Sequence, residues 1–326
     1  MKLLNNGNKK AFSLIELSIV VLIIGIIIAG ITQSSRVLDL YKLSSARTQT
    51  QSSPVNSIGG LVVWYEATSE NSFDNKETDN YTDLTAADKA LGKGVISTWH
   101  DISSSTGIKD NLTQSTLASR PQYLSDCING LPCINFDGTD DTLSFDGVKI
   151  DEIIASNYTI FIVNKKTDTG DNPKVILGSS ESETLHIGYK DNDEISWGHS
   201  VGNISTLNPA SVALEDNNPT LHVFVNEVID GFDTVDPKGN YFYYANGTST
   251  IEDLDETLAG VSKGVTTGLS SYTSHTVGSG LLNTTATNYT GGIGEIIIFK
   301  RALKSQERND VENYLIKKWL IKPDNS

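Results

Sequence analysis

The longest apolar run in the chain lies close to its N-terminus. From Phe12 to Ile31 the sequence contains no lysine, arginine, aspartate or proline, and Glu16 is its only charged residue. These twenty residues match the roughly 20 that a membrane-spanning helix needs. Because lysines precede the run, the positive-inside rule predicts a cytoplasmic N-terminus. The pattern predicts a single-pass anchor, with all later residues on the other side of the membrane.

A more polar segment follows, and it contains nothing that would stop a helix. Residues 32–53 have neither glycine nor proline, and they continue a thin apolar stripe. The helix is therefore expected to run from Phe12 to about Ser53, on the order of 60 Å at 1.5 Å per residue. Pro54, and the Gly-Gly pair after it, are expected to end it. A flexible Ser/Thr-rich linker over the last third of the segment is the alternative.

From Leu61 onward, short β-branched and aromatic runs recur between turn-like segments. This spacing is typical of strands joined by turns, and without helices between them it predicts an all-β sandwich of two sheets. The predicted strands lie within residues 61–67, 94–103, 132–138, 142–148, 158–166, 174–180, 184–190, 194–200, 221–228, 240–247, 275–281 and 291–303. A short helix is expected to close the chain, with Ser305 as its N-cap. Its apolar face would consist of Val311, Tyr314, Leu315 and Trp319.

Charge and cysteine content narrow the choice of compartment and partner. The net charge is −15, and without the three lysines of the first eleven residues it would be −18. Nucleic-acid binding is excluded as a main role, since it depends on neutralising phosphates with Lys and Arg. Cys127 and Cys133 lie six residues apart with Gly and Pro between them, which favours a disulfide in an oxidising compartment. Two reduced, buried thiols are the alternative, and no further Cys or nearby His completes a metal site.

The N-terminal stretch KKAFSLIELSIVVLIIGIIIAG resembles the class III leader and first helix of type IV pilins and pseudopilins. The resemblance implies cleavage by prepilin peptidase between Ala11 and Phe12, followed by N-methylation of Phe12. It also implies that Glu16 pairs with the terminal amine of a neighbouring subunit during assembly. Such a partner would offset the roughly 2.5 kcal/mol or more that a carboxylate costs inside a membrane. Two residues depart from the family pattern, namely Ala11 in place of Gly and Gln33 in place of a common proline.

The rest of the chain, residues 54–326, resembles the laminin-G/concanavalin A-like jelly roll. The resemblance rests on LVVWYEA, WHDISSSTG, RPQYLSDCINGLPCINFDGTDDTLSF, YTIFIVNKK and GGIGEIIIFKRALKSQERNDVENYLIKKW, which occur in the family's order. Together the two resemblances imply a leader over residues 1–11, a transmembrane and assembly helix over 12–53 and a β-sandwich head over 54–326.

Jelly rolls include sugar hydrolases, so paired carboxylates are relevant. Those enzymes align Glu-x-Asp-x-Glu on one strand, but in IEDLDE the residue between Glu252 and Glu256 is Leu254, and the aspartates would face the other way. GHSVG, at residues 198–202, matches the G-x-S-x-G pattern but lacks the helix that a nucleophile elbow needs after it. The five histidines are scattered, with no i, i+4 pair to bind zinc. No catalytic residues are assigned, and the protein is not expected to be an enzyme.

Acidic and aromatic residues suggest possible ligands of the head. Asp137, Asp140 and Asp141 in FDGTDDTLSF lie close enough in sequence to contribute to a calcium site, which takes 6–8 oxygens. The alternative is a hairpin turn in which Asp-Gly supplies the backbone angles, and no other cofactor is expected. Aromatic residues could stack on sugars, but strand alternation makes most of them core. The relevant side chains are Trp64, Trp99, Tyr241, Tyr243 and Tyr244, and one face of 240–247 is expected to be buried.

These observations predict a minor type IV pilin-like subunit that displays a β-sandwich adhesin or binding head. Its partners would be other pilin or pseudopilin subunits, prepilin peptidase, and a glycan or protein ligand that the sequence does not identify. The chain would sit in the inner membrane before assembly, with a periplasmic head, and then in a surface filament. The alternatives are a minor pseudopilin of a type II secretion system and a membrane-displayed carbohydrate-active jelly roll.

Overall fold

The computed structural model describes residues 14–69, 72–74, 94–104, 109–145, 157–167, 174–179, 185–190, 194–198, 204–207, 216–228, 239–247, 252–253, 275–282 and 285–323. The chain separates into two compact units, Met1–Ser44 and Ser45–Ser326, and the second is called the head below. Helix α1 (Leu14–Gln51) forms the described part of the first unit, and its last turns belong to the head. Over the described stretches, no helix combines enough length with enough apolarity to cross a membrane.

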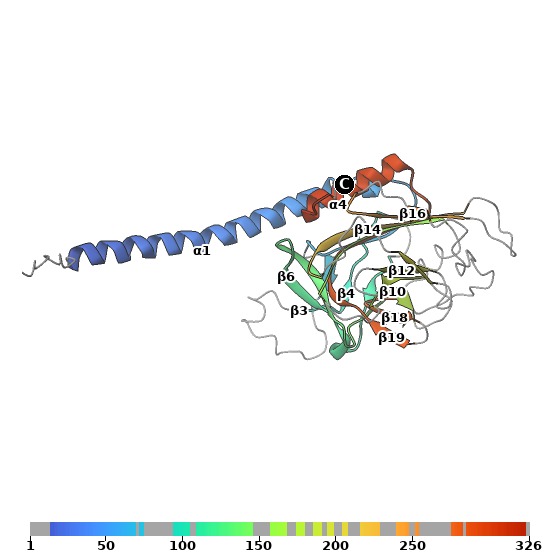
Figure 1. Ribbon diagram of the computed structural model, residues 1–326, viewed down its shortest axis with the longest axis horizontal. Helices are drawn as coiled ribbons and strands as arrows, with labels where there is room; N and C mark the ends of the chain where they lie inside the picture. Colours follow the sequence, from blue (N-terminus) through green and yellow to red (C-terminus); the bar gives the residue numbers. More distant parts are fainter. Residues whose placement is uncertain are drawn as a thin grey trace, which may run out of the picture. The chain divides into compact units, whose positions relative to one another are not determined.

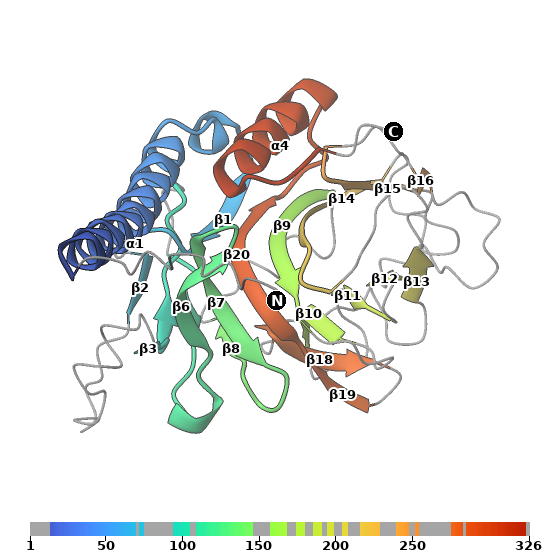
Figure 2. The ribbon, with the colours of Figure 1, turned by 60° about the vertical axis from the view of Figure 1, so that its left-hand side comes forward.

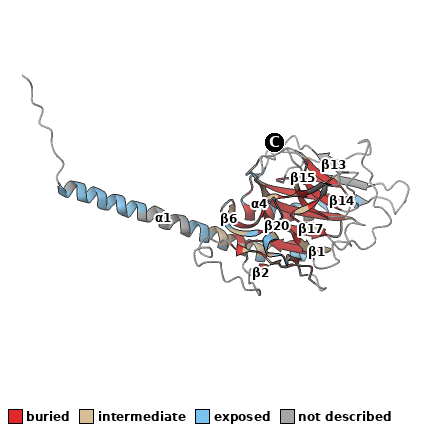
Figure 3. Cartoon of the chain, turned by 90° about the horizontal axis from the view of Figure 1, so that it is seen from below, coloured by how far each residue is buried: buried red, intermediate tan, exposed pale blue. Residues whose placement is uncertain are grey.

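Helix α1 ends two residues before the position predicted from the sequence. Its last residue is Gln51, and a short 3₁₀ turn, η1 (Val55–Ser57), begins directly after Pro54. Proline has no N–H to donate to a preceding carbonyl, so it cannot continue the helix. Large apolar side chains between Leu14 and Ile28 are exposed in the single chain, and this part of α1 is pale blue in Figure 3. The division of α1 into a membrane half and a periplasmic half stays a prediction.

The head is a sandwich of two main sheets, as predicted. The first, called the β20 sheet, has the strand order β16 (Glu252–Asp253), β15 (Gly239–Ala245), β14 (Pro219–Val228), β9 (Tyr158–Lys166), β20 (Thr290–Phe299), β7 (Leu131–Asp137), β6 (Gln122–Ile128) and β3 (Gly94–Val95), with β1 (Leu61–Glu66) paired to β20. The second, called the β10 sheet, has the order β13 (Ile204–Leu207), β12 (Ile195–Gly198), β11 (His186–Tyr189), β10 (Lys174–Ser179), β17 (His275–Val277), β8 (Leu143–Phe145), β5 (Leu112–Thr113), β4 (Thr98–Trp99) and β2 (Phe73–Asp74). A separate hairpin consists of β18 (Ser279–Leu282) and β19 (Thr285–Asn288). Figure 1 shows β14 and β16 in one layer, with β10 and β12 in the other.

Strand β20 lies at the centre of its sheet. On one side it pairs with β9 along most of its length, and on the other side its first half pairs with β7 and its second half with β1. Figure 2 shows this arrangement, with β20 in orange between β1 and β9. Nine of its ten residues are buried. A polar residue on β20 therefore needs a partner within the protein.

Two predicted strands are each divided between two elements. The stretch 94–103 becomes β3 and β4, which belong to different sheets, because the chain crosses the sandwich at Ile96 and Ser97. The stretch 275–281 becomes β17 and β18, and Gly278 lies between them at a φ of +95°. Residues with a Cβ rarely adopt this conformation, so glycine permits the change of direction.

The C-terminal helix α4 (Ser305–Trp319) buries the predicted apolar face. Val311, Tyr314, Leu315 and Trp319 are all buried. Its start differs by one residue from the prediction, since Ser305 is the first helical residue and Lys304 occupies the cap position. The backbone N–H of Lys304 donates to the Glu307 carboxylate at 3.1 Å, so this carboxylate satisfies the free N–H at the helix start.

Aromatic side chains fill the core, which confirms their predicted structural role for the residues that can be placed. Trp64 and Trp99 are almost fully buried. On β15, however, buried tyrosines occur on both faces of the strand. Tyr243 lies 5.3 Å from Phe224 between ring centroids, and Tyr244 lies under the Arg308 guanidinium at 3.8 Å. Arg308 belongs to α4, which covers this face of the sheet at Tyr244.

Candidate functional site

The last turns of α1 are packed into the head. Ala46 is almost fully buried, and the Arg47 guanidinium donates from Nε to the backbone oxygen of Thr68 at 2.9 Å. One turn later, the Thr50 hydroxyl lies 3.5 Å from the Tyr314 hydroxyl on α4. These contacts explain why the second compact unit begins at Ser45, within α1.

Strand pairing brings two buried carboxylates together above this junction. Glu66 on β1 is directly opposite Glu295 on β20, and opposed residues of antiparallel strands point to the same side of the sheet. Both are essentially inaccessible to solvent. The β20 ladder shifts register around Gly294, where an added Cβ would lie 2.6 Å from the Trp319 ring. The absence of a side chain at Gly294 therefore lets α4 approach the strand closely at this point.

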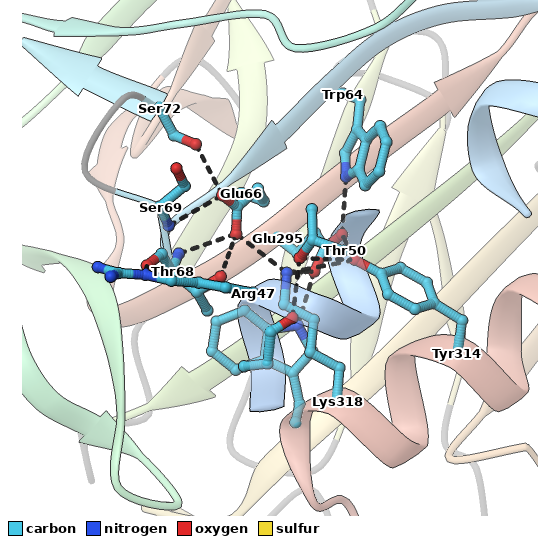
Figure 4. A network of polar contacts seen from close by, with 12 residues as sticks. Arg47, Thr50, Trp64, Glu66, Thr68, Ser69, Ser72, Glu295, Tyr314 and Lys318 are labelled. Carbon is cyan, nitrogen blue, oxygen red and sulfur yellow. Dashed lines mark hydrogen bonds and ion pairs between the residues drawn. The ribbon is translucent and has the colours of Figure 1, made fainter. Parts of the chain in front are cut away.

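Lys318 on α4 reaches between the two carboxylates. Its Nζ lies 3.0 Å from Glu66 Oε2 and 2.8 Å from Glu295 Oε2, and all three side chains are fully buried. Figure 4 shows Lys318 pointing into a ring of polar groups contributed by both strands and both helices. Buried charges of this kind occur where they are paired and hydrogen-bonded.

Three aromatic side chains complete the surroundings of Glu295. The indole N–H of Trp64 donates to Oε1 at 2.7 Å, and the Tyr314 hydroxyl donates to the same oxygen at 2.7 Å. The Trp319 indole donates to Oε2 at 2.8 Å. Each oxygen of Glu295 thus accepts two hydrogen bonds, counting the bond from Lys318.

Glu66 has a different set of donors. Its carboxylate accepts from the backbone N–H of Thr68 and Ser69, each at 2.9 Å, and from the Thr68 and Ser72 hydroxyls at 2.5 and 2.7 Å. Burial alone would raise the pKa of Glu66, but the charge of Lys318 and these hydrogen bonds outweigh it and lower the pKa to about 2. Glu66 therefore remains a carboxylate at neutral pH.

The predicted acidic cluster also forms, in the loop between β7 and β8. Carboxylate oxygens of Asp137, Asp140 and Asp141 all lie within 4.8 Å of one another, and only Asp141 is buried. Asp137 Oδ1 accepts from the Thr139 backbone N–H at 2.7 Å, and Asp141 Oδ2 accepts from that of Asp137 at 2.9 Å. These bonds are those of a tight turn, which was the alternative interpretation. The cluster offers three of the 6–8 oxygens that calcium takes.

Electrostatics in this loop favour a cation or a proton. Burial of Asp141, with added repulsion from Asp137 and Asp140, raises the pKa of its carboxyl from 3.8 to about 6, although the N–H of Asp137 opposes the shift. A positive charge bound between the three carboxylates would attract all of them, and it would lower the pKa of Asp141 that their mutual repulsion raises.

The predicted disulfide is present between Cys127 on β6 and Cys133 on β7, with a Cα–Cα distance of 5.7 Å. The turn between them is made by Asn129 and Gly130, both at positive φ, and it is held against α4 because Asn129 Nδ2 donates to the Trp319 carbonyl at 2.8 Å. Gly292 on β20 lies under the bond, since a Cβ there would be 2.4 Å from both sulfur atoms. The disulfide therefore packs directly on the central strand.

Two histidines of the head, His222 and His186, take part in core packing. His222 on β14 is fully buried between the hydroxyls of Tyr189, 2.9 Å from Nε2, and Tyr243, 2.7 Å from Nδ1. Asn164 extends the chain of contacts by donating to the hydroxyls of Tyr189 and Tyr289, each at 2.9 Å. Burial lowers the pKa of His222 to about 3, so this ring is neutral. His186 pairs with Ser196 Oγ at 2.8 Å and is also kept neutral by burial, which lowers its pKa to about 4.

Several sequence candidates fall outside the described residues. Glu252 begins strand β16, but Leu254 and Glu256 are not among the described positions, and neither are residues 199–202 of the GHSVG pattern. Ala11 and Phe12 also lie outside the description. Glu16 belongs to helix α1, but its side chain is not among those described.

Comparison with known protein families explains the N-terminal pattern. Residues 6–32 match the prokaryotic N-terminal methylation motif. The match includes the predicted cleavage position and Glu16, and it ends within α1. A comparison with curated protein sequences found no significant match.

The head is similar to parts of larger solved structures. Trypanosoma rangeli sialidase in complex with sialic acid aligns with a TM-score of 0.47 and 11% identity, over 81% of this chain and 34% of the sialidase chain. The botulinum neurotoxin serotype D/C binding domain aligns with a TM-score of 0.43 and 12% identity, over 80% of this chain and 53% of that domain. The chain thus spans about a third of the sialidase and about half of the toxin domain. Similarity at this level indicates neither an activity nor a ligand for the present chain.

The buried cluster around Lys318 was not predicted from the sequence. A signal was present, because Glu66 interrupts the apolar run LVVWYEA and Glu295 interrupts GGIGEIIIF. A charged residue inside a strand expected to be buried implies a buried partner. The sequence does not identify that partner, since Lys318 lies on a helix beside the equally basic Lys317.

Proposed function

We propose that this protein is a type IV pilin-like filament subunit, processed by prepilin peptidase, whose β-sandwich head binds a ligand outside the cytoplasm. The observation that carries the proposal is the match of residues 6–32 to the N-terminal methylation motif, followed by a helix that continues to Gln51. The disulfide in the head supports an oxidising compartment, where such bonds persist. The two-sheet architecture supports a binding role, because its loops and faces can carry a ligand site.

In this proposal each N-terminal residue has a defined role. Prepilin peptidase cleaves between Ala11 and Phe12, and Phe12 becomes the N-methylated first residue. Glu16 then pairs with the terminal amine of a neighbouring subunit. The pairing favours a filament over lipid, because a carboxylate in the membrane is costly unless an opposite charge meets it. Before assembly the chain is held in the inner membrane with its head in the periplasm.

The size of the head suggests a minor subunit. A head of this bulk is more easily placed at low copy or at a filament tip than at every position of a shaft. Its ligand would be a surface, a glycan or a protein, and calcium at Asp137, Asp140 and Asp141 would be an additional component. A minor pseudopilin of a type II secretion system is the second candidate, since it would use the same N-terminal motif.

Assembly can be tested by replacing Glu16 with alanine. We expect Glu16→Ala to insert into the membrane normally but to be strongly reduced in sheared surface filaments, because the carboxylate that meets the neighbouring amine is gone. Asp39→Ala is a matched control, since Asp39 is an acidic residue of the same helix outside the methylation motif. Normal incorporation of Glu16→Ala would refute the pairing argument. A wild-type protein found only in the periplasm, and never in filaments, would favour the secretion system.

Processing can be tested by mass. The mature protein should begin at a methylated Phe12, and Ala11→Leu should accumulate as uncleaved precursor because the bulkier side chain obstructs the peptidase. A precursor that keeps its first eleven residues in the wild-type strain would remove the basis of the proposal.

Ligand binding can be tested with the head on a glycan array, with and without EDTA. A glycan signal that is lost with EDTA and in Asp137→Asn would support both binding and calcium, and a signal unaffected by either would support binding alone. A membrane-displayed sugar-cleaving enzyme remains as an alternative from another class. Cleavage of glucans that disappears in Glu252→Gln or Glu256→Gln would establish it.

A further inference from the structure

The ion pair of Lys318 and Glu295 holds an amine nitrogen next to a carboxyl group from which water is excluded. Lys318 Nζ lies 2.8 Å from Glu295 Oε2, while the other oxygen of that carboxylate, Oε1, accepts from both the Trp64 indole and the Tyr314 hydroxyl at 2.7 Å. Two donors on one acyl oxygen stabilise negative charge that develops when a nucleophile adds to the carbon. A lysine amine is a competent nucleophile once it has lost its proton.

Glu66 is placed to accept that proton. Its Oε2 lies 3.0 Å from Lys318 Nζ, on the side away from Glu295. Two backbone N–H groups and two hydroxyls already hold Glu66 as a carboxylate, whereas Glu295 is held by side-chain donors alone. Those donors make Glu66 a weak base that holds the proton only in transit, while Glu295 is the acyl group.

We propose that Lys318 and Glu295 form an intramolecular amide bond, with Glu66 relaying the protons. The Lys318 nitrogen forms a bond to the Glu295 side-chain carbonyl carbon, and the bond from that carbon to Oε2 breaks. Two of the three ammonium protons leave with Oε2 as one molecule of water, and the third stays on the amide nitrogen. One ammonium and one carboxylate are consumed, so charge balances and no oxidant or other reactant is needed. The inference does not depend on the proposed function.

The surrounding donors and acceptors suit this product. The amide oxygen would keep the hydrogen bonds from Trp64 and Tyr314, and the amide N–H would keep Glu66 as its acceptor. Trp319 Nε1, which donates to Oε2, would donate to the released water instead. The reaction also removes one buried ion pair, whose desolvation is costly, and leaves Glu66 as a buried carboxylate that keeps its hydrogen bonds from Thr68, Ser69 and Ser72.

Burial and proximity both favour formation of the amide bond. In water, condensation of an ammonium with a carboxylate is opposed by the solvent, but these side chains are fully buried. Groups held in contact within a folded protein can react at effective concentrations of roughly 10⁵ M or more. The bond would join α4 to the central strand of the β20 sheet, close to Thr50 in the last turn of α1.

The test is mass spectrometry of the full chain purified in detergent. We expect the intact protein to be lighter than its processed sequence by one water, beyond the hydrogens lost in the disulfide. A tryptic digest should contain a branched peptide in which the segment ending at Lys300, which carries Glu295, is joined to the segment around Lys318. Linear peptides from both regions, together with an intact mass that lacks this deficit, would overturn the proposal.

Three variants refine the test. Lys318→Arg keeps the positive charge but not the amine, so the deficit and the branched peptide should both disappear. Lys317→Arg is the matched control at the exposed neighbouring position, and it should retain them. Glu66→Gln removes the proton acceptor and should lower the cross-linked fraction several-fold, whereas an unchanged fraction would contradict the role of Glu66. If Lys318→Arg fails to fold, the wild type and Lys317→Arg still decide the matter, because the branched peptide is either present in both or absent.

Discussion

Replacing Lys318 by methionine should destabilise the head more than almost any other single change. Methionine fills a similar volume but leaves Glu66 and Glu295 facing each other without a positive partner, and both are buried. Removing one partner of a buried ion pair costs about 3–5 kcal/mol. The pKa of Glu66 in the wild type is consistent with a cost of this magnitude. Its decrease from 4.5 to about 2 corresponds to roughly 3 kcal/mol, at 1.36 kcal/mol per pKa unit.

The pH dependence gives the variant a distinctive signature. While Lys318 carries its charge, before any amide forms, the pKa of Glu66 is lower in the folded state than in the unfolded state. Its contribution to stability is therefore complete above about pH 4.5 and is lost as the pH falls toward 2. In Lys318→Met the charge that lowers the pKa of Glu66 is lost, so burial would instead raise it. Relative to wild type, the variant should therefore become more stable as the pH falls from neutral to about 5.

Urea unfolding measures both effects. A fragment beginning at Ser45, the first residue of the head, is unfolded at neutral and mildly acidic pH and followed by fluorescence of its buried tryptophans. Lys317→Met is the control, since Lys317 is exposed and should change the free energy of unfolding by less than about 0.5 kcal/mol. A Lys318→Met protein as stable as this control would refute the reasoning, as would a deficit that grows when the pH is lowered.

Other parts of the head yield three further predictions. Because burial raises the pKa of Asp141 to about 6, its ionised form opposes folding at neutral pH, so Asp141→Asn should melt at a higher temperature than wild type at pH 7, with the difference shrinking toward pH 4. A head fragment starting at Pro54 lacks the buried Ala46 and the bond from Arg47, and its free energy of unfolding should be about 1–3 kcal/mol lower than that of the fragment from Ser45 in urea titrations. Reduction of the Cys127–Cys133 disulfide should lower the melting temperature measured by circular dichroism. The loss in free energy of unfolding should be about 2 kcal/mol, because the closed loop is short.

Elements that depend on local pattern were predictable from the sequence. Strand β9 coincides with the predicted stretch 158–166, and α4 buries its four predicted apolar residues. The disulfide was also predictable, because Cys127 and Cys133 lie close together on either side of a turn and are the chain's two cysteines. The prediction was less accurate where the chain moves between sheets, as at 94–103, since a strand that changes sheet has the same residue pattern as one that does not.

The N-terminal motif could be recognised from the sequence because it consists of residues in a fixed order and spacing along the chain. Charge order, the spacing of Glu16 and an uninterrupted apolar run all follow the chain, and the proposed role depends on that order. The acidic loop was visible for the same reason, since its three aspartates lie within five residues of one another.

Only the tertiary structure revealed the cluster around Lys318. Glu66 lies more than 200 residues before Glu295 and Lys318 in the chain, and the three charged groups meet because β1 pairs with β20 in one register and α4 packs on that sheet at Gly294. A shift of one residue in the pairing would turn Glu66 or Glu295 to the opposite face. Sequence alone determines which residues carry charge and which stretches are apolar. The fold determines which of those charges are buried next to one another. Because water is excluded there, Lys318 interacts strongly with Glu66 and Glu295, and the proposed amide bond becomes possible.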